Sequence, residues 1–343
     1  MSCPRICPRP SPLRTSRSSR LLQFARPMQP WTATNPPLAR LSASDENTVP
    51  VRFPRRLGLG GGSCERPRGR ARRGTGLRER AMAKPSLRQA VAALTLLLAA
   101  PAGAVELTYL ANEGVMLSDG QIAVVIDGLF RKGIEPYARH APGELEKLET
   151  ALPPYDRVRL VLVSHHHGDH FDPASVARFL LANPMARLVS SPQVADAVAA
   201  LHPGRVEGLL PAEGQKTTRS FGGVSVTLFP LSHGEGRHAR VQNLGHLVRI
   251  GGLTFLHVGD AETGAARFDL YHLPKEKIDV ALVPFWYLLS EGGRRTLREH
   301  IQARTVVAFH LPPPEYERWA PQILAGDPKA VILRTPGTRH TYR

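Results

Sequence analysis

The chain has 343 residues and a formal net charge of +16 at pH 7, but the charge is unevenly distributed. Residues 1–81 hold 17 Arg, no Lys and four acids, which accounts for +13 of the total. The rest of the chain is close to neutral and has no basic recognition segment, which argues against nucleic acid as a partner or substrate.

The first 81 residues are rich in Arg, Pro, Ser and Gly and show no apolar periodicity. Such a segment buries too little apolar surface to offset the entropy of ordering it, so we expect a disordered extension. A tail that binds nucleic acid or an anionic membrane is the functional alternative. Our hypothesis is that Met82 is the true initiator and that residues 1–81 are upstream sequence translated in error.

Residues 82–104 have the pattern of a secretory signal peptide. MAKPSLRQ is a basic start, an apolar core follows, and Ala-Gly-Ala provides a cleavage site that ends at Ala104. The core, Ala90 to Ala100, has 11 residues, whereas a spanning helix needs roughly 20, so we expect no permanent membrane anchor. The predicted location is the periplasm or the outside of the cell.

Residues 105–343 are predicted to form one α/β domain. All three cysteines lie upstream of it, in residues 1–81, and all 14 histidines lie within it, so metal ligands must be imidazoles and carboxylates. Apolar runs predict strands at 106–110, 121–126, 158–164, 187–190, 224–229, 244–250, 253–258, 279–283 and 305–309. Helices are expected at 143–152, 173–181, 192–201 and 295–301. Strand-rich stretches with helices in both halves indicate two sheets with helices outside each.

The run Ser164-His165-His166-His167-Gly168-Asp169-His170 follows one of the buried strands. Four imidazoles and a carboxylate at such a position need a cation, because buried polar groups without partners are costly. An extended turn directs His165 and His167 to one position while Asp169 and His170 reach a second, and Gly168 provides the backbone freedom for the bend. The pattern therefore predicts a transition-metal site.

This run resembles the His-x-His-x-Asp-His signature of the metallo-β-lactamase superfamily, with His166 at the variable place. The resemblance implies a four-layer αβ/βα sandwich and a binuclear centre. It also implies further ligands: His233 as the third imidazole of the first metal, Asp260 as a carboxylate that bridges both metals, and His310 as the last ligand of the second metal. His238 is the nearest rival of His233.

Asp127 matches the early aspartate of the superfamily, and we expect it to accept a ring N–H from a ligand histidine. A simple turn aspartate is the alternative. Histidines 140, 202, 246, 257, 272, 300 and 340 are interpreted as structural or surface residues. The Gly-His pair that many lactonase-like members carry near the first strand is replaced here by Asn112-Glu113. The aromatic segment Pro284 to Tyr287 either lines the pocket or belongs to the core.

The sequence predicts an exported hydrolase in which two divalent metals, with zinc as the first expectation and iron or manganese fitting nearly as well, hold a bridging hydroxide. Asp169 and Asp260 are its predicted catalytic carboxylates. In the superfamily, the bridging aspartate favours the branch that acts on small esters, lactones, thioesters or phosphodiesters. The alternatives are a non-catalytic exported metal-binding protein, a β-lactamase or a nuclease. The oligomeric state is not predicted.

Overall fold

The structure is a computed structural model that describes residues 103–343. The proposed extension at 1–81 and nearly all of the proposed signal peptide at 82–104 lie outside the described residues. Among the described residues, no helix combines the length and apolar character needed to cross a membrane.

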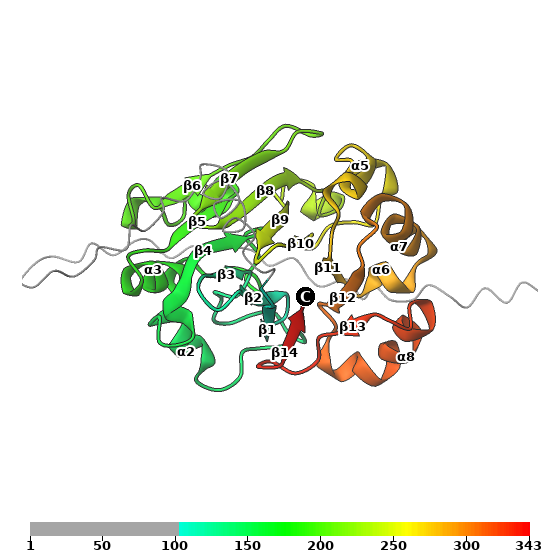
Figure 1. Cartoon of the computed structure of the whole chain (residues 1–343), viewed down its shortest axis with the longest axis horizontal. Coiled ribbons are helices and arrows are strands. Elements are labelled where there is room, and N and C mark those ends of the chain that lie inside the picture. Colours follow the sequence, from blue (N-terminus) through cyan, green and yellow to red (C-terminus); the bar gives the residue numbers. More distant parts are fainter. Residues whose placement is uncertain (1–102) are drawn as a thin grey trace, which may run out of the picture. The chain divides into compact units, whose positions relative to one another are not determined.

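Fourteen strands form two seven-stranded sheets (Figure 1). The first sheet has the order β14-β1-β2-β3-β4-β5-β6 and the second the order β13-β12-β11-β10-β9-β8-β7. The strands of the first sheet are β1 (Val105–Ala111), β2 (Gly114–Ser118), β3 (Ala123–Ile126), β4 (Val158–Val163), β5 (Arg187–Ser190), β6 (Val206–Gly208) and β14 (Arg339–Tyr342). Those of the second are β7 (Thr217–Phe221), β8 (Val224–Pro230), β9 (Leu244–Ile250), β10 (Leu253–His257), β11 (Val280–Pro284), β12 (Thr305–Phe309) and β13 (Val331–Ile332).

Helices cover the outer face of each sheet (Figure 1). On the first sheet these are α2 (Glu144–Glu149), α3 (Pro173–Ala182) and α4 (Pro192–Ala195). On the second they are α5 (Ala265–Asp269), α6 (Trp286–Leu289), α7 (Glu291–Arg295) and α8 (Tyr316–Gly326), with a π-helical turn at Thr296–Ile301. The predicted layering of two sheets between helices is confirmed.

The central core lies between the two sheets. Alternate residues of β3 and β4, such as Val124 and Leu160, meet residues of the second sheet such as Val248 and Phe255 in one buried cluster. The intervening side chains of β3 and β4 face outward and pack with α3, through residues such as Phe179, in a separate cluster. Because the strands are buried on both faces, they appear in the sequence as continuous apolar runs.

Two helix predictions need correction. The helix expected at 192–201 ends at Ala195, and only a 3₁₀ turn forms at Ala199–Leu201. Val194 and Val198 are buried in the outer cluster, but Leu201 is 64 % exposed, so the last predicted turn has no core to pack against. The helix expected at 295–301 begins earlier, at Glu291, where the Ser290 side chain caps the Gly293 N–H, and it changes to π geometry from Thr296.

Several short strands have no counterpart in the predictions, namely β2, β6, β7, β13 and β14. The strand β14 contributes most to the architecture, because it pairs antiparallel with β1 and so places the C-terminal residues at the edge of the first sheet. β14 has the polar sequence RHTY, and its residues alternate between exposed and partly buried. Such a sequence gives little indication of a strand, which forms here because β1 is available for pairing.

Candidate metal centre

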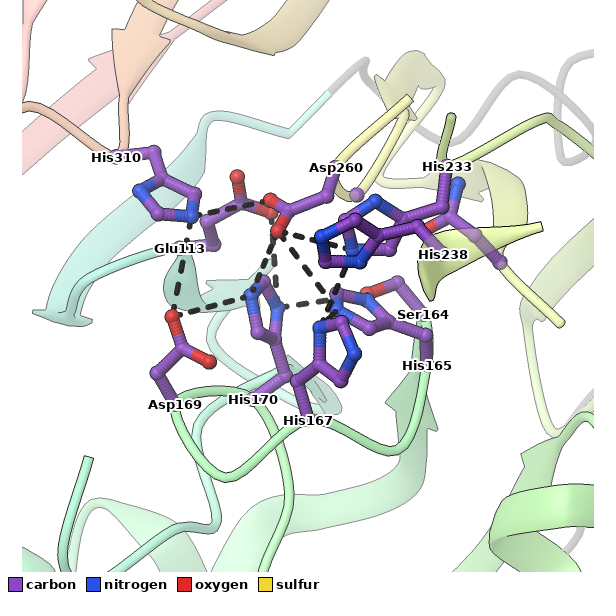
Figure 2. Close-up of polar contacts among 12 residues, drawn as sticks. Glu113, Ser164, His165, His167, Asp169, His170, His233, His238, Asp260 and His310 are labelled. Carbon is purple, nitrogen blue, oxygen red and sulfur yellow. Dashed lines mark hydrogen bonds and ion pairs between the residues drawn. The ribbon is translucent and has the colours of Figure 1, made fainter. Parts of the chain in front are cut away.

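The candidate ligands all follow the C-terminal ends of strands. The loop 165–170 follows β4, His233 follows β8, Asp260 follows β10 and His310 follows β12. In each sheet the neighbouring strands that run parallel, such as β3 with β4 and β11 with β12, end at the same edge. Ligand sites in such sheets form outside the carboxyl ends of the strands. Figure 2 shows the side chains pointing toward one another from these separate segments.

The first cluster contains three imidazoles and one carboxylate. His167 Nδ1 lies 3.0 Å from His165 Nε2 and 3.2 Å from His233 Nε2. Asp260 Oδ2 lies 3.7 Å from His165 Nε2 and 3.4 Å from His233 Nε2. The four side chains offer ligand atoms that all lie within 4.8 Å of one another, so they are arranged to contact a single ion.

The second cluster lies on the other side of Asp260. His310 Nε2 is 3.1 Å from Asp260 Oδ1, and His170 Nε2 is 3.6 Å from Asp260 Oδ2. Asp169 Oδ2 lies 3.7 Å from His170 Nε2 and 3.8 Å from His310 Nε2. Asp260 thus contacts imidazoles of both clusters, which is the arrangement that a bridging carboxylate requires.

The electrostatics of the first cluster favour the neutral imidazoles of His165 and His167, and the neutral form is the one that binds metal. Burial, followed by the nearby His170, lowers the pKa of His165 well below its usual value. Burial and the neighbouring His233 lower the pKa of His167 to about 4. For Asp260, burial alone raises the pKa, but His310 and His170 outweigh it and hold the pKa well below its usual range. The carboxylate is therefore ionised.

The unpaired buried atoms provide a test of whether these residues fit metal ions. Among the described residues, His170 Nε2 and Asp260 Oδ1 are buried without a hydrogen-bond partner. His170 is fully buried and Asp260 is 9 % exposed. Leaving such groups unpaired costs about 1–3 kcal/mol each, whereas coordination satisfies them. The donors are nitrogen and oxygen atoms, which suit Zn, Fe or Mn, so the residues fit the ions that the sequence predicts.

Asp127 orients one of the histidines from beneath the site. His170 Nδ1 donates to Asp127 Oδ2 at 2.9 Å, which leaves His170 Nε2 facing the second cluster. The backbone N–H of Ser164 donates to Asp127 Oδ1 at 2.7 Å, and its hydroxyl also contacts the carboxylate. This contact is the one that the sequence predicts for Asp127.

Replacing Asp127 with Asn is expected to weaken metal binding about 10- to 100-fold, because loss of such an acceptor frees the ring of a ligand histidine. Isothermal titration of the metal-free protein measures this. The control is Asp119→Asn, which removes a carboxylate from the turn before β3 that accepts the N–H groups of Gln121 and Ile122. Equal affinity of the two variants for metal would contradict the role given to Asp127.

The backbone is strained at several of the positions that form the site. Asn112, Asp127 and His310 have φ values of 44°, 48° and 60° without being glycine. Gly259, with φ 57°, precedes Asp260, and a Cβ there would lie 2.3 Å from the Asn243 side chain. Left-handed non-glycine residues cost roughly 1–3 kcal/mol each and cluster at functional sites.

The two sides of the centre have different surroundings. A cavity of about 460 Å³ borders the first cluster and is lined by His233, His238 and Arg240 among others. On the side of the second cluster, the rings of Tyr137 and Trp286 lie 4.0 and 5.4 Å from the ring of His310. His238 stacks on His233 at 4.5 Å and stands outside both ligand clusters.

The structure brings together all seven predicted ligands, which are His165, His167, Asp169, His170, His233, Asp260 and His310. His166 is exposed, as its variable place suggests. Two further residues, Ser164 and Glu113, border the site. Ser164 has a sequence signal, since it directly precedes the histidine run. Glu113 has a weaker one, namely an acid between two short apolar strands.

None of the histidines set aside as structural belongs to the two clusters around Asp260, although His257 forms a third group of potential ligands with Glu113 and Asp127 among the described residues. His257 Nε2 is 3.1 Å from the Glu113 carbonyl oxygen, and His140 Nε2 is 2.8 Å from the Gly128 carbonyl oxygen. His246 is buried in the core, and neither of its nitrogens has a partner among residues 103–343. Burial lowers the pKa of His246 to about 3, so its ring is neutral.

Comparisons with known proteins give consistent similarities. Residues 125–327 match the sequence model of the Beta-lactamase superfamily domain. A UPF0173 metal-dependent hydrolase from Pyrococcus abyssi is 26 % identical over 231 residues, which is 64 % of this chain and 95 % of the relative. One from Thermus thermophilus is 29 % identical over 212 residues, covering 60 % of this chain and 83 % of the relative.

Solved structures show the same fold at low identity. The metallo-beta-lactamase fold protein YhfI from Bacillus subtilis is 14 % identical with a TM-score of 0.50, covering 70 % of this chain and 100 % of its own. Isothiocyanate hydrolase from Delia radicum gut bacteria is 17 % identical with a TM-score of 0.50, and the match covers 69 % of this chain and 99 % of that protein.

Proposed function

The chain belongs to the metallo-β-lactamase superfamily, and on that premise we propose that it is a metal-dependent hydrolase that cleaves an ester-type bond in a small molecule. The observation that carries the proposal is the convergence of five imidazoles and two carboxylates, from four separate segments, around Asp260. The relatives from Pyrococcus abyssi and Thermus thermophilus, which are named metal-dependent hydrolases, support it.

The ligand assignment follows the two clusters. His165, His167 and His233 would hold one divalent ion, and His170, His310 and Asp169 the other, with Asp260 between them. When bound, two such ions would polarise a carbonyl or phosphoryl oxygen and lower the pKa of a bound water to about 7. Zinc, iron and manganese are all compatible with these donors.

The protein's own groups fix the geometry in which this chemistry takes place. Asp127 holds the ring of His170. Asp260 lies near His170 through Oδ2 and near His310 through Oδ1, and its negative charge would offset the positive charge of the bound ions. The rings of Tyr137 and Trp286 pack against the ring of His310. The cavity beside His233 offers space for the remainder of a small substrate. These features support small esters, lactones, thioesters or phosphodiesters as the substrate class.

A substrate screen tests the proposal. The purified protein, supplied in turn with Zn²⁺, Mn²⁺ and Fe²⁺, is assayed against lactones, thioesters, phosphodiesters and β-lactams, beside a chelated sample and the His167→Ala variant. We expect metal-dependent hydrolysis of at least one ester-type class, abolished by chelation and by His167→Ala. A protein that binds metal but hydrolyses no member of the panel would be the non-catalytic metal-binding protein, and the proposal would be wrong.

We also propose that the protein acts outside the cytoplasm. The signal-like segment 82–104 supports this, and β1 begins at Val105, so cleavage after Ala104 leaves the whole strand in place. N-terminal sequencing of the exported protein is expected to give Val105 as the first residue. Recovery of a fragment that begins at Met1 would contradict both the export route and the assignment of Met82 as initiator.

A further inference from the structure

Glu113 occupies the tight connection between β1 and β2 and is completely buried. Its carbonyl oxygen lies 3.1 Å from His257 Nε2, which anchors the backbone beneath the site. The preceding residue, Asn112, donates through its side chain to Asp169 Oδ2 at 3.1 Å. The connection is thus attached both to the second sheet and to the loop that carries the predicted ligands.

The carboxylate of Glu113 points into the second cluster. It offers a ligand atom within 4.8 Å of those of His170, Asp260 and His310, and one within 4.8 Å of those of Asp127 and His257 on the inner side. Its Oε2 is 3.7 Å from His170 Nδ1, the nitrogen that contacts Asp127. Figure 2 shows it beside the Asp260 carboxylate and the His310 ring. Among residues 103–343, neither oxygen of Glu113 has a hydrogen-bond partner, and no arginine or lysine forms an ion pair with it.

This arrangement is costly without a cation. Burial raises the pKa of Glu113 well above its usual value, and the neighbouring Asp260 raises it further. Burying the Glu113 carboxyl without a partner beside Asp260 is unfavourable for folding, because the group loses its hydration and the two acids repel each other when both are ionised. A divalent ion between them removes both costs, as it does for Asp260.

The two clusters also differ in chemical character once Glu113 is counted. The first has three imidazoles and shares Asp260. The second has the imidazoles of His170 and His310 with the carboxylates of Glu113, Asp169 and Asp260. Carboxylate oxygens favour hard cations such as Mn²⁺, whereas imidazoles suit Zn²⁺ and its neighbours.

We propose that Glu113 is a ligand of the second metal and that it raises the preference of that site for Mn²⁺ relative to Zn²⁺. This inference rests on the proposed function, since it assigns one more donor to the same centre. The inference adds Glu113 to the seven ligands that the sequence predicts. It also gives the two metal sites different metal preferences.

The test is titration of the metal-free protein with manganese chloride, with free Mn²⁺ followed by electron paramagnetic resonance, and a parallel zinc titration. Glu113→Gln is expected to weaken Mn²⁺ binding at one of two sites by about 100-fold and to weaken Zn²⁺ binding there less. Glu113→Asp should give an intermediate loss. The matched control is Glu146→Gln, which removes an exposed carboxylate on α2 and is expected to leave both metal affinities unchanged.

The stability of the metal-free protein provides a second measurement. Metal-free Glu113→Gln is expected to be at least as stable as the wild type, because the buried carboxyl has no hydrogen-bond partner among residues 103–343 and an amide of the same shape loses no contact. A less stable metal-free variant would assign the carboxyl a structural role and overturn the inference. Two sites with unchanged affinity in Glu113→Gln would also overturn it while leaving the proposed function intact. A wild-type protein that binds neither metal would overturn the proposed function itself.

Discussion

Replacing Asp260 with Asn is expected to lower metal-dependent hydrolysis by about 1,000-fold, which corresponds to a loss of about 4 kcal/mol of transition-state stabilisation. Its Oδ2 lies within 3.7 Å of His165 and its Oδ1 within 3.1 Å of His310, so the amide removes a charge that serves both clusters. The measurement is kcat/KM for a substrate identified by the screen, at saturating metal.

The control for this variant is Asp269→Asn, at the end of α5. That carboxylate is exposed and lies 3.5 Å from the surface residue His300, apart from the predicted ligands. We expect it to retain wild-type kcat/KM. If Asp260→Asn retains more than about a tenth of the activity, a loss of under about 1.4 kcal/mol, the role of Asp260 between two ions is wrong.

Removing the metals with a chelator is expected to abolish hydrolysis and to lower the thermal stability. At metal concentrations 1,000-fold above Kd, each ion contributes about 4 kcal/mol, and a domain of this size loses roughly 2–4 °C in Tm per kcal/mol, so one site corresponds to about 8–16 °C. The physical reason is that Glu113, Asp169 and Asp260 lie buried around the second cluster and lose their compensating charge. Differential scanning calorimetry measures the change.

Two controls accompany the chelation experiment. Restoring Zn²⁺ or Mn²⁺ is expected to recover both the Tm and the activity. The His340→Ala variant changes an imidazole on the edge strand β14, where it pairs with Leu107, and should show the full metal-dependent shift. A Tm that is the same with and without chelator would mean that the clusters do not bind ions in the native state.

The sequence predicts the strands well because they are buried on both faces. The runs that form β5, β9 and β12 are predicted with the bounds that the structure has, and those of β4, β8 and β11 within one residue. Each is a short and largely apolar segment, rich in β-branched residues, and its length rather than a period distinguishes it from a helix. Of the strands that were missed, β14 is polar and only partly buried, and it forms because β1 is available as a partner. β2 is apolar and buried, and the predictions omit it although its sequence carries a strand signal.

The site is predicted for a similar reason. The loop 165–170 concentrates its donors in sequence, and His233, Asp260 and His310 each lie within three residues of the end of a buried strand, so local patterns point to them. The signal for Glu113, an acid between two short apolar segments, does not by itself indicate a ligand. Its significance depends on the β1–β2 connection lying against β10 through His257 and against the ligand loop through Asn112, which are contacts between residues far apart in the chain.

The most direct measurement of the central claim is anomalous diffraction from crystals of the metal-loaded protein. Two anomalous peaks are expected, one contacting His165, His167 and His233 and one contacting His170 and His310, with Asp260 bound to both. A single peak, or peaks located away from these side chains, would contradict it.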